Sequence, residues 1–214
     1  VPKFQKLIEG RGTKDYYLRG TFTRFHQDFA EDVKALASIG RNISVEPVVG
    51  KEDDPYALQE ADLPALKAEY ERLAEDLRDH PETFFHFKGD LAQGPCVIKR
   101  LRGCGAGCEY VAITPEGDIY PCHQFVGNED YKLGSLYDGT FDQELSGRFA
   151  GLNIYTREEC RDCWARFYCS GGCSASNLLV NGDIKKPHRV GCELERKRLE
   201  CAIALRAIAA GMAE

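Results

Sequence analysis

Long apolar stretches are missing from this sequence. The longest are short, strand-like runs such as residues 43–49, whereas a membrane-spanning helix needs about 20 consecutive apolar residues. Residues 1–10 are rich in charge and hold no apolar segment of the kind that a secretory signal requires. We therefore expect no membrane partner and no secretion. The first residue is Val1 instead of methionine, which indicates a piece of a longer protein.

An excess of basic residues is missing as well. The sequence has 28 Lys and Arg against 34 Asp and Glu, a formal net charge of -6. Its basic residues are also scattered, whereas a nucleic-acid-binding surface concentrates positive charge on one face. We expect no nucleic acid partner.

Cysteine, in contrast, is abundant. The chain has ten cysteines in 214 residues, and four of them lie in the short run Cys160–Cys173, CRDCWARFYCSGGC. Such short spacings present several thiolates to one centre, whereas a disulfide between near neighbours closes a loop too short to stabilise much. We therefore expect metal ligation and a reducing compartment.

Residues 1–90 alternate between strand-like and helix-like patterns. Strands are predicted at 16–23, 42–49 and 84–87, with helices between them at 29–40 and 62–77. This βαβαβ order predicts parallel strands joined by right-handed crossovers. Three parallel strands cannot close a barrel, so further strands must come from a missing N-terminal part or a second chain. The alternative is a small independent α/β unit.

Residues 91–192 are rich in Gly, Cys and turns. A β-hairpin is predicted from 111–114 and 119–122, with Gly117 where a positive φ is needed, and its second strand delivers Cys122. Residues 193–214 read as an amphipathic helix that we expect to pack against the first domain.

Two four-iron clusters match the cysteine count, because each iron of such a cluster binds one thiolate. Eight cysteines are available in three groups: Cys104, Cys108, Cys122, Cys160, Cys163, Cys169, Cys173 and Cys192. Gly171 and Gly172 suit a close approach of the backbone to a cluster. Zinc is the alternative, but a zinc ribbon has two C-x2-C knuckles and the dense run has only one.

The order of these cysteines resembles that of SPASM-containing radical S-adenosylmethionine enzymes. Their C-terminal domains follow C-x9-15-G-x4-C, then C-x2-C-x5-C-x3-C, then a last Cys, and Cys104, Gly117 and Cys122 match the first part. The stretches SVEPVVG, FFHF, GPCVIKR, GCGAGCEYVAITPEGDIYPCHQFVG and CWARFYCSGGC resemble the maturases of SCIFF peptides, which are small, cysteine-rich ribosomal peptides.

The resemblance implies the fold and the activity of the complete protein. The fold is α/β: a partial (β/α) barrel segment over 1–90, a small cysteine-rich α+β SPASM-type iron–sulfur domain over 91–192, and a C-terminal helix over 193–214. The chain would be the C-terminal portion of a cytoplasmic enzyme that joins a cysteine sulfur of a precursor peptide to a threonine carbon through a thioether.

The resemblance also implies the ligands of two auxiliary [4Fe-4S] clusters. The distal cluster would be bound by Cys160, Cys163, Cys169 and Cys192, and the cluster nearer the barrel by Cys104, Cys122 and Cys173. Cys108 either supplies a fourth thiolate or leaves an iron open to the substrate thiolate. An open iron would lower the pKa of the donor cysteine, whereas a fully ligated cluster would serve electron transfer.

The radical chemistry requires a C-x3-C-x2-C loop, and no three cysteines here have that spacing. This chain alone is therefore predicted to bind clusters and to be inactive. The complete enzyme would use S-adenosylmethionine, a third [4Fe-4S] cluster, a cysteine-rich precursor peptide and an electron donor such as ferredoxin or flavodoxin.

Other candidate residues have two interpretations each. Cys96 is a catalytic thiol or a structural cysteine, and His123, where sulfatase-maturing relatives have Asp, is a proton acceptor or an ordinary hydrogen-bonding residue. Arg19 and Glu46 on the barrel-like strands contact S-adenosylmethionine or peptide, or satisfy buried charge in an ion pair. Cys201 is expected in the core.

Two rival functions stay open. The first is a SPASM enzyme with another radical modification of a peptide, such as a carbon–carbon link. The second is a non-catalytic metal-binding scaffold that recruits a cysteine-rich peptide.

Overall fold

The structure is a computed structural model that describes residues 2–88 and 97–212. The chain divides into two units, Val1–Gly94 with Arg189–Glu214, and Pro95–His188. Cys96 and the expected domain boundary after residue 90 lie outside the described residues. Each unit is described by itself.

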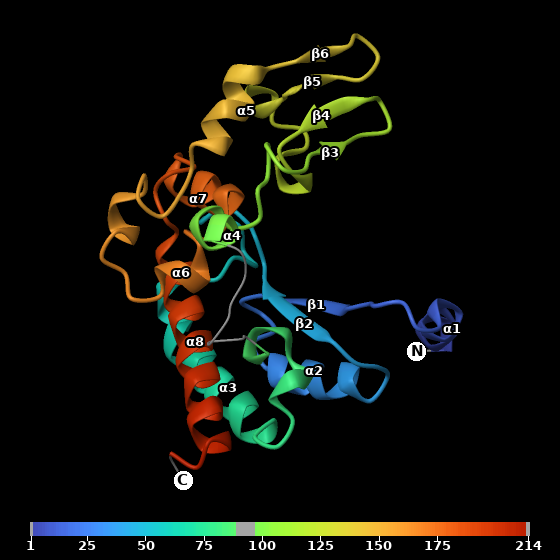
Figure 1. Cartoon of the computed structure of the whole chain (residues 1–214), viewed down its shortest axis with the longest axis vertical. Coiled ribbons are helices and arrows are strands. Elements are labelled where there is room, and N and C mark those ends of the chain that lie inside the picture. The colour runs from blue at the N-terminus through green and yellow to red at the C-terminus, as the bar shows by residue number, and fades with distance from the viewer. Residues whose placement is uncertain (1, 89–96, 213–214) are drawn as a thin grey trace. The chain divides into compact units, whose positions relative to one another are not determined.

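The first unit combines helices with a small sheet (Figure 1). Its elements are α1 (Pro2–Arg11), β1 (Leu18–Phe22), α2 (Phe29–Ala37), β2 (Ile43–Pro47), η1 (Glu60–Asp62), α3 (Leu63–Asp76), η2 (Pro81–Thr83), η3 (Phe85–Phe87) and α8 (Arg189–Ala209), where η marks a short 3-10 helix.

Strands β1 and β2 pair in parallel, and α2 forms the connection between them (Figure 1). Leu18 lies opposite Ile43, and Phe22 lies opposite Pro47. The strand ends at Pro47, which has no backbone N–H to donate to a sheet. The first two predicted strands and their parallel pairing are confirmed.

The predicted third strand over 84–87 is wrong. Phe84 forms a single parallel bridge with Ile43, and the 3-10 helix η3 follows at once. Phe84 and Phe87 are buried while Phe85 is 46% exposed, which is the spacing of a helical turn instead of the alternation of a strand. The sheet of this unit has two strands within the described residues, and the partial barrel stays a prediction.

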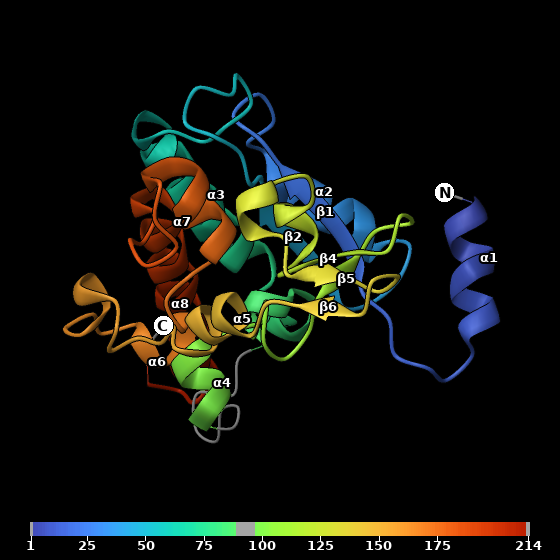
Figure 2. The ribbon, with the colours of Figure 1, turned by 90° about the horizontal axis from the view of Figure 1, so that it is seen from above.

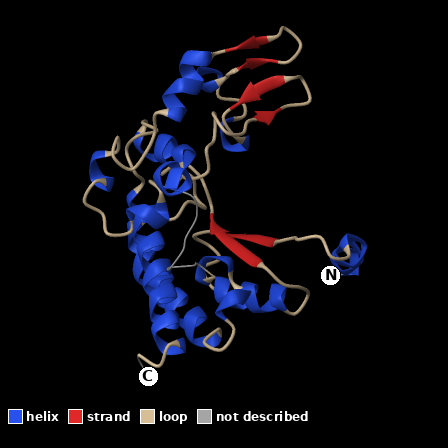
Figure 3. Ribbon diagram, viewed as in Figure 1, coloured by secondary structure: helices blue, strands red, loops and turns tan. Residues whose placement is uncertain are grey.

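The core of the first unit lies between its sheet and helices α2, α3 and α8. Phe29 joins the strands to α3, because its ring stacks on Phe22 and contacts Tyr70, both at a centroid distance of 4.5 Å. Helix α8 packs along α3 and against η3 (Figures 1 and 3). This confirms that the C-terminal helix packs against the first domain, although it begins at Arg189 and therefore includes Cys192.

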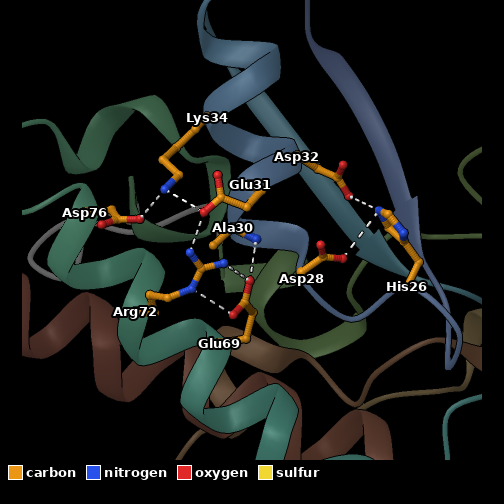
Figure 4. Close-up of polar contacts among 9 residues, drawn as sticks. All are labelled: His26, Asp28, Ala30, Glu31, Asp32, Lys34, Glu69, Arg72 and Asp76. Atoms are coloured by element: carbon orange, nitrogen blue, oxygen red, sulfur yellow. Dashed lines mark hydrogen bonds and ion pairs between the residues drawn. The ribbon is translucent and has the colours of Figure 1, made fainter.

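Polar contacts also connect α2 with α3 (Figure 4). Arg72 contacts Glu31 at 2.5 Å and Glu69 at 2.6 Å. Glu69 in turn accepts a hydrogen bond of 2.9 Å from the backbone N–H of Ala30, one of the amides that the first turn of α2 leaves without a helical partner. The exposed ion pairs contribute little each, so the Glu69 contact is the one that fixes where α2 begins.

The second unit consists of short helices and a four-stranded antiparallel sheet in the order β3-β4-β5-β6 (Figure 1; β4, β5 and β6 are also labelled in Figure 2). Its elements are α4 (Val97–Arg102), β3 (Ala112–Ile113), β4 (Asp118–Tyr120), η4 (His123–Phe125), η5 (Glu129–Tyr131), β5 (Gly134–Ser135), β6 (Thr140–Phe141), α5 (Gln143–Ala150), η6 (Glu158–Cys160), α6 (Arg166–Cys169) and α7 (Ser174–Asn181).

The predicted hairpin is present in this sheet. Ala112 pairs with Tyr120 and Ile113 with Ile119, and Gly117 has a φ of 84° in the turn. Strands β5 and β6 extend the hairpin and were not expected from the sequence. Of the helices in the described ranges, none is long and apolar enough to cross a membrane.

Candidate metal centre

The dense cysteine run folds around a left-handed turn. Cys169 ends helix α6, and Cys173 is the N-cap residue of α7. Between them Ser170, Gly171 and Gly172 all have positive φ values, of 58°, 90° and 72°. Within this turn the N–H of Ser170 donates to the Arg166 carbonyl at 2.9 Å, and the N–H of Gly172 donates to the Cys169 carbonyl at 3.3 Å. The positive φ values favour glycine at positions 171 and 172, and a close approach of this backbone to a cluster stays a prediction.

Two close approaches bring the loop of Cys104 to the other cysteine segments. Gly103 lies so near Ser170 that a Cβ on the glycine would be 3.4 Å from the Ser170 Cβ. The backbone N–H of Gly107 donates a hydrogen bond of 2.9 Å to the carbonyl of Pro121, the residue before Cys122. The loop is thus connected to both the segment after Cys169 and the end of the hairpin.

Three of these cysteines lie near enough to Tyr110 to affect its pKa. Partial burial raises the pKa of Tyr110, and so do the nearby Cys104, Cys122 and Cys173, with a hydrogen bond between the Tyr110 hydroxyl and Cys104. These three cysteines come from three separate segments and form one predicted ligand set, and their binding of one cluster stays a prediction.

Cys122 is the buried member of this set. It is 6% exposed, and burial raises its pKa, as do Cys173 and Cys104, while the backbone amides of Gln124 and Phe125 lower it. Since a thiol with a raised pKa stays protonated at neutral pH, a metal that binds here must displace that proton.

Cys108 forms a hydrogen bond within its own loop. Its side chain is exposed, and its thiol donates to the carbonyl of Gly105 at 3.4 Å. The choice between a fourth protein ligand and an open iron stays a prediction.

The second predicted set is divided between the two units. Cys160 and Cys163 follow each other through η6, where the N–H of Cys163 donates to the Cys160 carbonyl at 3.2 Å, and Cys169 lies at the end of α6. Cys192 belongs to α8 in the first unit, and its role as a ligand stays a prediction.

Arg157 is a buried charge among the cysteines. It is 1% exposed, and it precedes η6, where its carbonyl accepts from the N–H of Cys160 at 3.0 Å. Burial lowers its pKa, and the neighbouring Cys160, Cys169, Cys104 and Cys173 oppose that shift. These four cysteines come from both predicted ligand sets. The sequence contained no signal for Arg157, because nothing in its spacing sets it apart from other arginines.

A converging group of metal ligands and disulfide bonds are both absent from the residues that the structure describes. No three His, Cys, Asp or Glu side chains converge as ligands of one metal ion. The nine cysteines of the described ranges form no disulfide bond.

Arg19, His123, Cys201 and Glu46 are the remaining candidate residues within the described ranges. Arg19 is an exposed residue of β1, opposite Ser44 in the sheet register. His123 is exposed at the first position of η4. Cys201 is buried in α8, where it donates to the Tyr70 carbonyl at 3.6 Å, and burial raises its pKa to about 11; its place in the core is confirmed.

Glu46 forms a buried polar network in the first unit. Its Oε1 lies 2.8 Å from His86 Nε2, and its Oε2 lies 3.4 Å from an Arg198 nitrogen. Arg198 Nε also donates to the Tyr70 hydroxyl at 2.7 Å. In this structure Glu46 thus satisfies buried charge, the second of its two interpretations, while a role toward S-adenosylmethionine or peptide stays a prediction. The sequence reasoning missed Arg198, although it occupies an inward position of α8 one turn after Leu194.

The charges of this network follow from its burial. Burial alone would raise the pKa of Glu46, but His86 and Arg198 outweigh that and lower it. Burial and then the charge of Arg198 lower the pKa of His86, against the pull of Glu46. We therefore take His86 as neutral at pH 7, with its Nε2–H donated to a charged Glu46 that pairs with Arg198.

The network predicts that acid destabilises the first unit. Between pH 7 and 5, His86 of the unfolded chain binds a proton because its pKa is the ordinary 6.5. In the folded chain the pKa of His86 is lower, so the imidazole stays neutral. Stability is therefore expected to fall by up to about 1.4 kcal/mol per pH unit below 6.5. Glu46, with its pKa below the usual 4.5, adds a loss of the same sign in stronger acid. Urea unfolding of the iron-free chain across this range measures the slope.

His86→Gln keeps a donor for Glu46 and removes the titration, so it is expected to flatten the slope between pH 7 and 5. His80→Gln is the matched control, because His80 is exposed beside Glu82. An unchanged slope in His86→Gln would contradict the neutral buried histidine.

The cysteine-rich part of the chain matches a family of known domains. Residues 104–164 match the family model of SPASM, an iron-sulfur cluster-binding domain. This range includes Cys104, Cys122 and Cys160.

Relatives of known sequence match about half of the chain. It is 31% identical over 112 residues to the mycofactocin maturase MftC of Mycobacterium ulcerans (50% of this chain, 29% of the relative). It is 31% identical over 110 residues to the MftC of Mycolicibacterium smegmatis (50% and 27%). An uncharacterized protein of Archaeoglobus fulgidus is 32% identical over 98 residues (44% and 23%). Each match thus spans less than a third of the relative.

The fold is similar to a solved structure of native anSMEcpe with bound AdoMet and Cp18Cys peptide. The TM-score is 0.57 at 16% identity, and the match covers 96% of this chain and 61% of the other. At this identity the likeness shows a shared fold.

Proposed function

We propose that this chain is the C-terminal part of a radical S-adenosylmethionine peptide maturase, and that its cysteines hold two auxiliary [4Fe-4S] clusters. The observation that carries the proposal is that Cys104, Cys122 and Cys173, from three separate segments, all lie near enough to Tyr110 to raise its pKa. The match of residues 104–164 to an iron-sulfur cluster-binding domain supports it. So do relatives that are mycofactocin maturases and a fold neighbour solved with bound AdoMet and Cp18Cys peptide.

The residues of the second unit fit such clusters. Thiolates are the ligands that iron–sulfur clusters prefer, and Cys169 and Cys173 lie on either side of the left-handed turn from Ser170 to Gly172. The buried Arg157 supplies positive charge, and its Nε has no hydrogen-bond partner among the residues that the structure describes. When bound, a cluster here would supply a site for thiolate coordination or for one-electron transfer.

The proposal assigns the cysteines to the two clusters. Cys104, Cys122 and Cys173 would bind one cluster, and Cys160, Cys163 and Cys169, with Cys192 as the predicted fourth ligand, would bind the other. The exposed thiol of Cys108, or a thiolate of the substrate, would complete the first cluster.

The finer proposal concerns the reaction of the complete enzyme. It would link a cysteine sulfur to a threonine carbon in a SCIFF-type, cysteine-rich precursor peptide, with S-adenosylmethionine, a third cluster and an electron donor such as ferredoxin or flavodoxin. The resemblance of SVEPVVG, GPCVIKR and the cysteine-rich stretches to SCIFF maturases supports this substrate class.

Anaerobic reconstitution of the chain with iron and sulfide tests the cluster assignment. We expect a brown protein with broad visible absorption and about eight irons per chain, four for each cluster. Iron and sulfide analysis gives the count. A colourless protein that retains zinc would contradict the assignment.

The complete enzyme tests the reaction. Supplied with S-adenosylmethionine, reductant and a cysteine-rich peptide, it is expected to release 5'-deoxyadenosine and a product lighter by two hydrogens, with one cysteine protected from alkylation. Release of 5'-deoxyadenosine with full alkylation would point to another peptide modification. No 5'-deoxyadenosine would point to the scaffold.

A further inference from the structure

Arg157 is held in place by neutral groups. Its Nη2 donates to the Ser174 hydroxyl at 3.0 Å and to the Ile184 carbonyl at 3.4 Å, and its Nη1 donates to the Ser170 carbonyl at 3.4 Å. Ser170 follows Cys169 and Ser174 follows Cys173, so two of these contacts lie directly beside predicted ligands. The contacts fix the guanidinium without neutralising its charge.

The Arg157 guanidinium occupies the space beside Gly171 that a side chain at that position would need. A Cβ on Gly171 would lie 2.0 Å from Arg157 Nη1, and Gly171 also has a φ of 90°. Glycine is therefore required there both by the backbone and by the guanidinium. The turn between Cys169 and Cys173 is built around Arg157.

A buried cation without an anionic partner is costly. Within the described residues no carboxylate pairs with Arg157 in an ion pair, and its buried Nε has no hydrogen-bond partner. The groups that attract its charge are Cys160, Cys169, Cys104 and Cys173. Those groups become anionic when they ligate a metal, so the partner that Arg157 lacks is supplied by thiolate-ligated clusters.

We infer that Arg157 is a positioning residue shared by the two cysteine sets, and that its buried charge raises the reduction potential of the auxiliary clusters beside it. The inference rests on the clusters of the proposed function. Reduction adds a negative charge to a cluster that is already anionic, and a fixed cation in a low-dielectric surrounding stabilises the reduced form more than the oxidised form. Because Arg157 interacts with members of both sets, at least one cluster should respond to it.

Redox titration of the reconstituted chain, followed by electron paramagnetic resonance, tests this role. Arg157→Met is expected to lower the one-electron reduction constant of at least one cluster about tenfold, a shift of about 59 mV to lower potential. Arg157→Lys keeps the charge and is expected to shift less. Arg161→Met is the matched control, since it removes the same charge from an exposed position four residues away, and it is expected to leave both potentials unchanged.

The outcomes separate this inference from the proposed function. A chain that takes up no cluster refutes the proposed function, whereas full iron content with equal potentials in Arg157→Met and Arg161→Met overturns only the role of Arg157. If Arg157→Met does not take up iron, Arg157→Gln replaces it as the neutral variant.

A measurement on the unmutated chain does not depend on how the variants fold. With 15N-labelled arginine, pulsed electron paramagnetic resonance of the reduced clusters is expected to show a 15N coupling that disappears in Arg157→Lys. The absence of this coupling, or its survival in the lysine variant, would overturn the inference.

Discussion

Replacing Cys160 and Cys163 together by alanine is expected to lower the iron content of the reconstituted chain from about eight to about four per molecule. The physical reason is that two irons of one cluster lose their thiolates while the other ligand set stays intact. Replacing Cys122 and Cys173 together is expected to remove the other four irons. Iron and sulfide analysis after anaerobic reconstitution measures both.

Cys201→Ala is the matched control for these variants. Cys201 is also buried, but its thiol donates to the Tyr70 carbonyl in the core of the first unit, so its loss is expected to leave all eight irons in place. If either double variant lost all of the iron, the chain would hold one cluster instead of two. A matching loss in Cys201→Ala would show that unfolding, instead of ligand removal, releases the iron.

The parts of the fold that the sequence predicted are those specified by local chemistry. Strands β1 and β2 are rich in aromatic and β-branched residues, and Pro47 ends the second of them. The hairpin depends on Gly117, whose positive φ few other residues adopt without strain. The spacing of the cysteines is equally local, which is why the amino-acid sequence alone indicates the cluster-binding part.

The errors arose where a pattern had two interpretations or a partner was distant. Three phenylalanines within 84–87 fit a strand by composition, but burial of Phe84 and Phe87 follows a helical turn. Arg157 and Arg198 are buried charges whose partners lie far away in the sequence, Glu46 being 152 positions from Arg198. No local pattern identifies such partners, so the polar networks of both units became visible only in the folded chain.

Arg198→Met is expected to destabilise the first unit by about 3 kcal/mol, the lower end of the range for breaking a buried ion pair. The substitution leaves the Glu46 carboxylate without its cation and the Tyr70 hydroxyl without the Arg198 donor. The lower end applies because the Glu46 side chain is 25% exposed and water can solvate part of its charge. Urea unfolding of the iron-free chain, followed by circular dichroism, gives the change.

Two further variants show whether the loss of stability comes from the unpaired Glu46 carboxylate. Arg206→Met removes the same charge from an exposed position of α8 and is expected to change stability by less than about 0.5 kcal/mol. Adding Glu46→Gln to Arg198→Met is expected to recover part of the loss, because a neutral amide is less costly to bury than an unpaired carboxylate. If the double variant were no more stable than Arg198→Met, the loss would reflect packing of the arginine stem. Recovery would instead show that α8 is fixed to β2 by charge as well as by its apolar face.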